Sequence, residues 1–369
     1  MANPNDLLMD QAIRNILNLQ GFSNAEVKKV VELINSQVLS KITNATTTGL
    51  LRSKSKSNIS RLTKRNNKII KDGYTTIYPE YKGDLFELSR IEAGLTVNAL
   101  EKSLPFSVNF NLPDAGTLRA IVTSEPFQGK LLRKWWSGLA RDAQDRIAQQ
   151  INMGIIQGES VPNIVRRLTG TSALNFTDGA YKTIRRNAES TVRTSINHVS
   201  NSAREHTYEA NSNVIASVQY VATLDARTTD ICAGLDGQQF QIQEGPRPPM
   251  HHQCRSTTVP VTKSFKELGF TGLNEIKSGR RASRTYTIGK GQRVKVDTRA
   301  QVKKIQDVGG TAPAKQTYGT WLKKQPKTIQ NKVLGKGRAE LFRDGLPIDK
   351  FTNNRNMSLS LGQLEKLGV

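Results

Sequence analysis

Apolar residues recur at three- and four-residue steps over most of residues 7–211, and a β-branched run follows directly. Such spacing places apolar side chains on one face of an amphipathic helix. It predicts helices over residues 85–100, 131–154 and 178–211, and Ser160 is positioned to cap a shorter one. The run from Val214 to Ala222 has the length and composition of a strand, and Ser256–Val261 is a second candidate.

We therefore expect an α+β protein whose N-terminal two-thirds is largely helical, followed by a small β-containing core and a helical tail. Shifts in composition predict five segments. These are a basic helical region at residues 1–75, a helical domain at 76–211, a β and loop core at 212–265, a basic stretch at 266–310 and a helical segment at 311–369. The basic stretch includes a predicted hairpin over residues 286–296.

Residues 7–43 have the pattern of two amphipathic helices. Gly21 is expected to break the pattern, and Ser23 or Asn24 can cap the second helix. The apolar faces of such helices either join a core or form a docking surface for a partner. Both alternatives stay open at the level of the sequence.

The chain carries 54 Lys and Arg against 31 Asp and Glu, a formal net charge of +23. Such a surplus attracts polyanions, and nucleic acid is the usual partner because neutralised phosphates release counterions. High net charge also keeps a protein soluble, which is the alternative explanation. The basic residues concentrate in two stretches, at 52–71 and 277–304. The candidate phosphate contacts, unless they form a solvated surface, are Lys54, Lys56, Arg61, Lys64, Arg65, Arg280, Arg281 and Arg284.

Composition excludes several classes of protein. Hydrophobic residues make up 36% of the chain, too many for a wholly disordered protein. No apolar run is long enough for a membrane span, and the N-terminus lacks the features of a secretory signal. The 2 cysteines cannot form a disulfide framework, so we expect synthesis in a reducing cytosol.

Both cysteines and two of the 4 histidines lie between residues 232 and 254. Thiolate sulfur and imidazole nitrogen are the ligands that suit zinc. Cys232, His251 and Cys254 could therefore supply three corners of a tetrahedral site. The fourth ligand would be Asp225, Asp230, His252 or water. Two buried thiols beside a neutral histidine need no metal, and this alternative stays open.

The same stretch carries spaced motifs. The first strand ends before Asp225-Ala226-Arg227-Thr228, and later positions are Cys232, Leu235-Asp236-Gly237, Phe240, Pro248-Pro249-Met250-His251 and Cys254-Arg255. This order resembles the Mu F-like domain of phage minor head, or head morphogenesis, proteins. Similar segments outside it are Phe127–Leu131, Gly154–Ser160, Ala188–Thr194, Tyr318–Leu322 and Val333–Gly335. The resemblance covers roughly residues 120–369.

Two positions depart from the family pattern. Many relatives carry a cysteine where this chain has Thr229, and another where it has Ser256. The resemblance is therefore compatible with a zinc site or with a hydrogen-bonded turn. The turn would be a structural motif of Asp225, Arg227, Asp236, Gly237 and Arg255, with Asp225 and Arg255 forming a buried or half-buried pair.

Catalytic motifs are missing from the sequence. It contains no His-Glu-x-x-His pattern, no Gly-x-Ser-x-Gly elbow and no P-loop. His198 and His206 lie on one side of a predicted helix but about 12 Å apart, too far to bind one metal directly. We expect them to be packing or surface residues, and we expect no catalytic residue in the chain.

The resemblance implies a minor head protein of a tailed phage, assembled in the host cytoplasm and located in the virion, at the capsid interior or portal vertex. Its implied partners are the portal protein, other capsid proteins and, non-specifically, phage DNA, with ejection alongside the genome a further implication. One alternative is a zinc-dependent nuclease or effector packaged in the virion. Another is a plain nucleic-acid-binding module.

Overall fold

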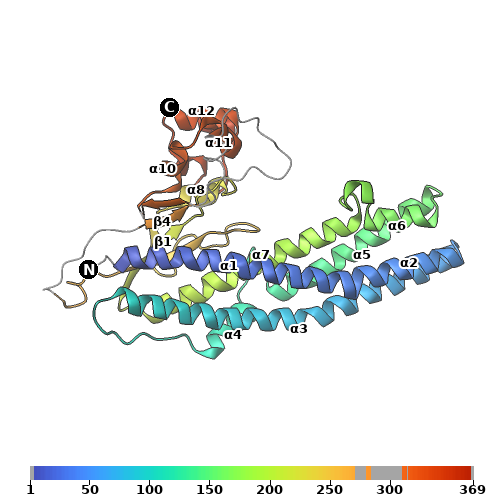
Figure 1. Cartoon of the computed structure of the whole chain (residues 1–369), viewed down its shortest axis with the longest axis horizontal. Coiled ribbons are helices and arrows are strands. Elements are labelled where there is room, and N and C mark those ends of the chain that lie inside the picture. Colours follow the sequence, from blue (N-terminus) through green and yellow to red (C-terminus); the bar gives the residue numbers. More distant parts are fainter. Residues whose placement is uncertain (1–3, 271–279, 284–309, 314, 367–369) are drawn as a thin grey trace.

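The computed structural model describes residues 4–270, 280–283, 310–313 and 315–366. Long helices form an elongated body, and a small sheet with the C-terminal helices stands on one end of it (Figure 1). The fold is therefore α+β, as the sequence predicted. None of the described helices combines the length and the apolar character that crossing a membrane requires.

The body contains the long helices of the chain. They are α1 (Pro4–Ile34), the π-helical turn η1 (Asn35–Leu39), α2 (Ser40–Arg52), α3 (Lys56–Ser103), α4 (Ala115–Thr123), α5 (Leu132–Ile156), α6 (Val161–Thr169) and α7 (Ala180–Ala210), with a short 3-10 turn η2 (Ser172–Leu174) before α7. The Ser160 side chain caps α6 by accepting a hydrogen bond from the backbone N–H of Asn163, as its position predicted.

One hydrophobic core runs along the body. It draws on α1, α3, α5 and α7, with Ile34, Tyr81, Ile147 and Val192 each at most 1% exposed. Trp136 is an anchor of this core, because its ring lies 5.4 Å from that of Tyr81 and its indole N–H donates to the Tyr74 carbonyl. Most of the apolar stripe of α1 is buried and belongs to the core, whereas Leu7 and Leu17 on it are 41% and 38% exposed.

Two sequence predictions for this region were wrong. Gly21 does not interrupt α1, which continues to Ile34. A single glycine costs only about 1 kcal/mol in a helix, and the buried residues on both sides outweigh this cost. The boundary drawn between residues 75 and 76 falls inside α3, whose buried face continues across that point from Ile70 to Ile77.

The sheet is antiparallel, with the order β2-β1-β3. Its strands are β1 (Ile215–Val221), β2 (Gln239–Phe240) and β3 (Thr257–Thr262), and the short helix α8 (Asp230–Leu235) lies between the first two. β1 and β3 pair from Ile215 opposite Thr262 to Val221 opposite Thr257. The bounds of β1 and β3 were each predicted to within one residue, whereas the two-residue β2 was not predicted.

A buried ion pair joins the sheet to the body. The Arg204 guanidinium on α7 lies 2.7 Å from the Glu92 carboxylate on α3, and the two side chains are 4% and 5% exposed. Arg204 also donates to the Thr257 hydroxyl of β3 at 2.5 Å. The side chains of Asn197 and Asn201 on α7 donate to the Ser256 carbonyl. The first residues of β3 are thereby held against the middle of α7.

The C-terminal segment forms a second, smaller core against α8. It consists of α10 (Tyr318–Lys323), α11 (Lys327–Leu334), α12 (Lys336–Arg343), the 3-10 turn η3 (Ile348–Phe351) and α13 (Leu361–Glu365). Before it, β4 (Arg280–Ser283) pairs with β5 (Gly310–Pro313). The hairpin predicted at 286–296 lies outside the described residues. The remaining domain boundaries stay predictions.

Candidate metal centre

The sheet and α8 bring the two cysteines together. Cys232 lies on α8, and Cys254 lies three residues before β3. Both thiols are buried, at 1% and 3% exposure, in a small cluster with Tyr220 and Leu235. The Tyr220 hydroxyl donates to the Cys232 sulfur at 3.2 Å. Packing of α8 and of the loop before β3 against β1 therefore places both sulfur atoms in one apolar cluster.

His251 completes a three-residue cluster with these thiols. Its Nε2 lies 3.3 Å from Cys232 Sγ, and the two sulfur atoms are 3.7 Å apart. The potential ligand atoms of Cys232, His251 and Cys254 all lie within 4.8 Å of one another. The His251 Nδ1 faces the His252 carbonyl at 2.9 Å, a contact that orients the ring with Nε2 toward the sulfur atoms.

Two of the three ligand separations in this cluster are close to those around a tetrahedral zinc ion. Two thiolates on a tetrahedral zinc, each about 2.3 Å from the metal, lie about 3.8 Å apart, and a thiolate and an imidazole nitrogen about 3.6 Å apart. The corresponding distances here are 3.7 and 3.3 Å. A bound zinc ion would hold α8 and the two loop residues at fixed separation.

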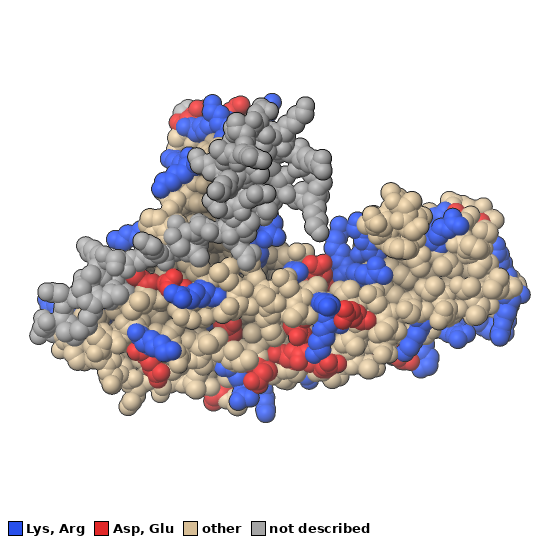
Figure 2. Space-filling model, viewed as in Figure 1, with Lys and Arg blue, Asp and Glu red and all other residues tan. Residues whose placement is uncertain are grey.

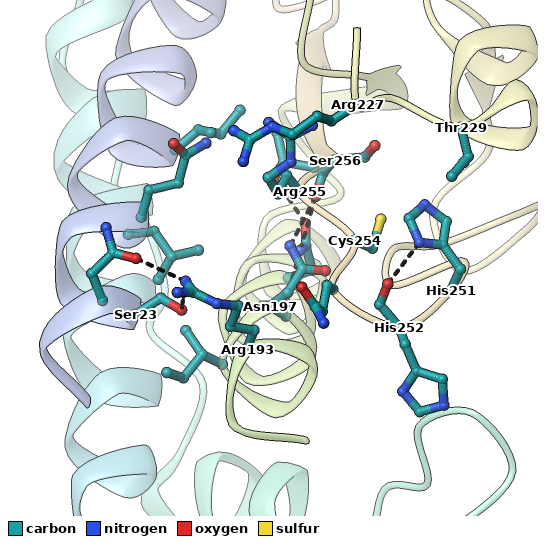
Figure 3. Close-up of a pocket in the computed structure, with 18 of the residues that line it drawn as sticks. Ser23, Arg193, Asn197, Arg227, Thr229, His251, His252, Cys254, Arg255 and Ser256 are labelled. Carbon is teal, nitrogen blue, oxygen red and sulfur yellow. Dashed lines mark hydrogen bonds between the residues drawn. The ribbon is translucent and has the colours of Figure 1, made fainter. Parts of the chain in front are cut away.

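The candidates for a fourth ligand are engaged elsewhere. Asp225 is paired with Arg255, and Asp230 is paired with Arg338 at 2.7 Å. The His252 ring packs edge-on against Trp135. Thr229 lines the same cavity as His251 and Cys254, and its hydroxyl is buried without a hydrogen-bond partner among the described residues. The cluster therefore offers three protein ligands among the described residues, and Thr229 lies beside His251 (Figure 3).

The surroundings shift the pKa values of the two thiols in opposite directions. The hydrogen bond to Cys254 and burial raise the pKa of Cys232 well above its usual value. The hydrogen bonds from Cys232 and from His251 lower the pKa of Cys254 well below its usual value, although burial opposes this shift. Burial lowers the pKa of His251, but the hydrogen bond and charge of Cys254 outweigh it, so the net pKa is raised. The surroundings thus disfavour ionisation of Cys232 and favour the ionised form of Cys254.

An ion pair lies beside the thiols. The Arg255 guanidinium donates to both carboxylate oxygens of Asp225, at 2.5 and 2.7 Å, and the two side chains are 20% and 6% exposed. Burial raises the pKa of Asp225, but the hydrogen bonds and charge of Arg255 outweigh it and hold the pKa below its usual value. Asp225 also accepts the backbone N–H of Arg227, whose own side chain is 66% exposed.

Asp236 links the loops to the C-terminal helices. One carboxylate oxygen accepts the backbone N–H of Ala222 at 2.6 Å, and the other accepts that of Tyr318 at 2.6 Å. The Tyr318 hydroxyl donates in turn to the Asp225 carbonyl. Gly237 follows with a φ of +87°, and a Cβ there would lie 2.9 Å from Thr317 Cγ2. The motif therefore connects β1, α8 and the start of α10.

The site lies within a segment of the chain that matches a known protein family. Residues 145–259 match the family model described as Phage Mu protein F like protein. The chain contains a Phage Mu F-like segment. This segment begins in α5, ends in β3 and includes α7, α8 and the Cys232, His251 and Cys254 cluster. The resemblance stated from the motifs is confirmed over these residues. Searches of curated proteins and of solved structures each found no match.

The candidate phosphate contacts lie far from the cluster in the chain. Lys54, Lys56, Arg61, Lys64 and Arg65, which we call the basic end, are all exposed around the start of α3. Figure 2 shows lysines and arginines gathered at the end of the body where α2, α3 and α6 lie. This stretch is helical rather than a loop from Lys56 onward, with Leu62 and Ile70 buried beneath it. The structure does not describe the side chains of Arg280 and Arg281, or any part of Arg284.

The two helix histidines behave differently from each other. His198 is 9% exposed and stacks on Phe127, with ring centroids 5.1 Å apart. His206 pairs with Glu125 at 2.5 Å and lies 3.5 Å from Glu209. Burial lowers the pKa of His198, whereas the hydrogen bond to Glu125 raises that of His206. Among the described residues they form no shared metal site with the acidic groups nearby.

The sequence did not reveal the partners of several residues that support the Mu F-like segment, although Arg338 belongs to the tail segment that resembles the family. Tyr220 reaches the Cys232 sulfur, and Arg338 on α12 reaches Asp230 from a distant part of the chain. Glu92 neutralises Arg204 within the core. The alternation of β1 could have marked Tyr220 as buried, but its sulfur partner depends on how α8 packs.

Proposed function

We propose that this protein is a minor head protein of a tailed phage, a structural component of the virion that acts in head morphogenesis. The observation that carries the proposal is the Mu F-like segment at residues 145–259. The family match supports a role in phage head morphogenesis. We also propose that it is located in the virion, at the capsid interior or portal vertex.

The way the segment is built into the chain supports a structural role. Its longest helix, α7, contributes Ile184, Val192 and Val199 to the core of the whole body. The pair of Glu92 with Arg204 ties it to α3, and Asp236 ties it to α10. Such connections make a rigid body that can transmit position between partners, and we propose the portal protein and other capsid proteins as those partners.

Packaged DNA is the third proposed partner. The basic end exposes lysines and arginines on one end of the elongated body, where they would meet phosphates without reading base sequence. Contacts of this kind suit a protein that lies beside condensed DNA, and they are weak enough to allow its ejection with the genome.

A phage that carries this reading frame with an early stop codon tests the proposal. We expect it to produce fewer DNA-filled heads, and the wild-type chain supplied in the same host should restore them. Electron microscopy of lysates counts filled and empty heads. Unchanged head yield in the absence of the protein would contradict the role in morphogenesis.

One observation favours a second candidate function, a zinc-dependent nuclease packaged in the virion. The cluster offers three protein ligands, and three-ligand zinc sites with an open position are typical of catalysis. Metal analysis and a nuclease assay on the wild type and on Cys254→Ala separate the two functions. The structural proposal predicts no zinc-dependent cleavage in either protein, whereas cleavage lost with Cys254 would support the nuclease.

A further inference from the structure

A cavity of about 610 Å³ lies between α1, α7 and the loop that carries His251 and Cys254. Four arginines line it (Arg193, Arg204, Arg227 and Arg255), and Glu189 is the one carboxylate residue in its described lining. Two of these arginines are neutralised within the protein, Arg204 by Glu92 and Arg255 by Asp225. Arg193 shares its charge with Glu189 at 2.9 Å, so most of the charge available to a ligand comes from Arg227, whose side chain is 66% exposed.

Arg193 and Arg227 reach the cavity from different elements. Figure 3 shows Arg193 extending from α7 toward α1 and Arg227 extending from the loop above. Arg193 contacts Glu189 and the Asn24 side chain, each at 2.9 Å. Arg227 is 66% exposed and lies 3.6 Å from the Asp225 carboxylate, which is itself held by Arg255. The guanidinium of Arg227 therefore retains donors for an anion.

Unpartnered polar atoms point to a ligand with both acceptors and donors. The Asn197 side chain is only 6% exposed, and its Oδ1 has no hydrogen-bond partner among the described residues, while its Nδ2 donates to Ser256. On the α1 side the amide nitrogen of Gln20 is buried and lacks an acceptor in the described structure. Buried groups of this kind are normally satisfied, so each indicates a missing partner.

The lining also has an apolar part. Ile16 and Leu19 on α1 and Ile196 on α7 face the same cavity. An anion alone would gain nothing from these side chains. An organic phosphate with a flat or apolar portion would bury that portion against them.

We propose that this cavity binds a nucleotide, either free or as one unit of a nucleic acid strand. The phosphate lies between Arg193 and Arg227, where planar guanidinium groups can hold its oxygens. A hydroxyl or amino group of the nucleotide donates to Asn197 Oδ1, and the base lies against the apolar part of the lining. This site is separate from the basic end and does not depend on the role of the protein in the head.

Calorimetric titration of the full-length protein tests the proposal with three probes: inorganic phosphate, deoxyadenosine monophosphate and a short single-stranded oligonucleotide. For the oligonucleotide, Lys54, Lys64 and Arg65 are replaced by Gln so that the basic end does not contribute. Arg227→Gln should weaken binding of the nucleotide probe roughly tenfold or more, because a hydrogen-bonded charge is lost. Arg90→Gln is the matched control, since Arg90 is 70% exposed on α3 and likewise contacts one carboxylate; it should leave binding unchanged.

The three probes show whether the cavity binds a nucleotide and whether that nucleotide is free or part of a strand. Binding of the mononucleotide that depends on Arg227 supports a free nucleotide, and binding of the oligonucleotide alone with the same dependence supports a strand. Equal affinity for inorganic phosphate and the mononucleotide overturns the nucleotide assignment. Absence of binding by either nucleotide probe, or binding that Arg227→Gln leaves unchanged, overturns the proposal. Arg193→Gln, checked for unchanged thermal unfolding, provides a second variant with the same expected loss.

Discussion

Asp225 is the residue on which the loops of the Mu F-like segment converge. Its carboxylate holds the Arg255 side chain and the Arg227 backbone, and its carbonyl accepts the Tyr318 hydroxyl. The Asp225 side chain is only 6% exposed. Removing its charge would leave the Arg255 guanidinium without its carboxylate partner in a largely buried place. A buried pair that loses one member is costly, even where the intact pair adds little net stability.

Asp225→Asn should therefore lower the free energy of unfolding by about 3 kcal/mol. Urea unfolding at neutral pH measures the change. Asp10→Asn is the matched control, because Asp10 also pairs with an arginine but the two side chains are 40% and 68% exposed. The control should cost less than about 1 kcal/mol. Similar losses in the two variants would show that burial does not govern the strength of the Asp225 pair.

The contribution of His206 to the free energy of unfolding should depend on pH. The hydrogen bond to Glu125 raises the pKa of His206 in the folded protein, so the folded state binds a proton more tightly than the unfolded chain. The stabilisation is complete below the unfolded pKa of about 6.5 and is lost as the pH rises through the folded value. His206→Gln should thus cost about 1 kcal/mol at pH 5.5 and less at pH 9 by thermal or urea unfolding. A cost that grows toward alkaline pH would contradict this assignment.

Some of the site could be predicted from single residues and some could not. The thiols and His251 lie close together in the sequence and have few alternative partners in the chain, so their clustering followed from residue type and spacing. Thr229 and Asp230 also lie close to Cys232 in the sequence, but the residue spacing does not show what either side chain contacts. Arg338 reaches Asp230 only because α12 folds back onto α8, which no local pattern encodes.

The full length of helix α3 could not be predicted from local sequence patterns either. Its basic first turns carry few apolar residues, and Pro79 lies inside it. Proline removes one backbone hydrogen bond and normally breaks a helix. Here Tyr74, Tyr81 and Leu85 are buried on both sides of it and keep the helix continuous. Periodicity predicted the helix at residues 85–100, but its full length depends on packing against α5 and α7.

A close approach of helices gives an element-scale prediction. A Cβ added at Gly73 of α3 would lie 2.4 Å from Val38 Cγ2 on η1, whereas one added at Gly83 of the same helix meets nothing within 4 Å. Gly73→Ala should destabilise the protein by about 1–3 kcal/mol through overpacking. Gly83→Ala should stabilise it by up to about 1 kcal/mol through helix propensity. Equal effects in thermal unfolding would contradict the close contact of α3 with η1.

For the whole molecule, the distribution of charge predicts a salt-dependent affinity for DNA. Replacing Lys54, Lys64 and Arg65 by Glu should weaken binding to duplex DNA and reduce the slope of log affinity against log salt by about 3, since each phosphate contact contributes about one unit. Fluorescence anisotropy at several salt concentrations measures both. Lys28→Glu on α1 is the control, because Lys28 is 77% exposed but lies outside the basic end. A slope unchanged in the triple variant would exclude the basic end as the contact surface.

We propose that this protein is a structural part of a phage head. Quantitative mass spectrometry of purified particles from a phage that encodes it tests this claim most directly. We expect peptides of the chain to be present in purified heads, at a constant ratio to the major capsid protein through successive purification steps. Their absence from purified particles, with the chain abundant in the infected cell, would contradict it.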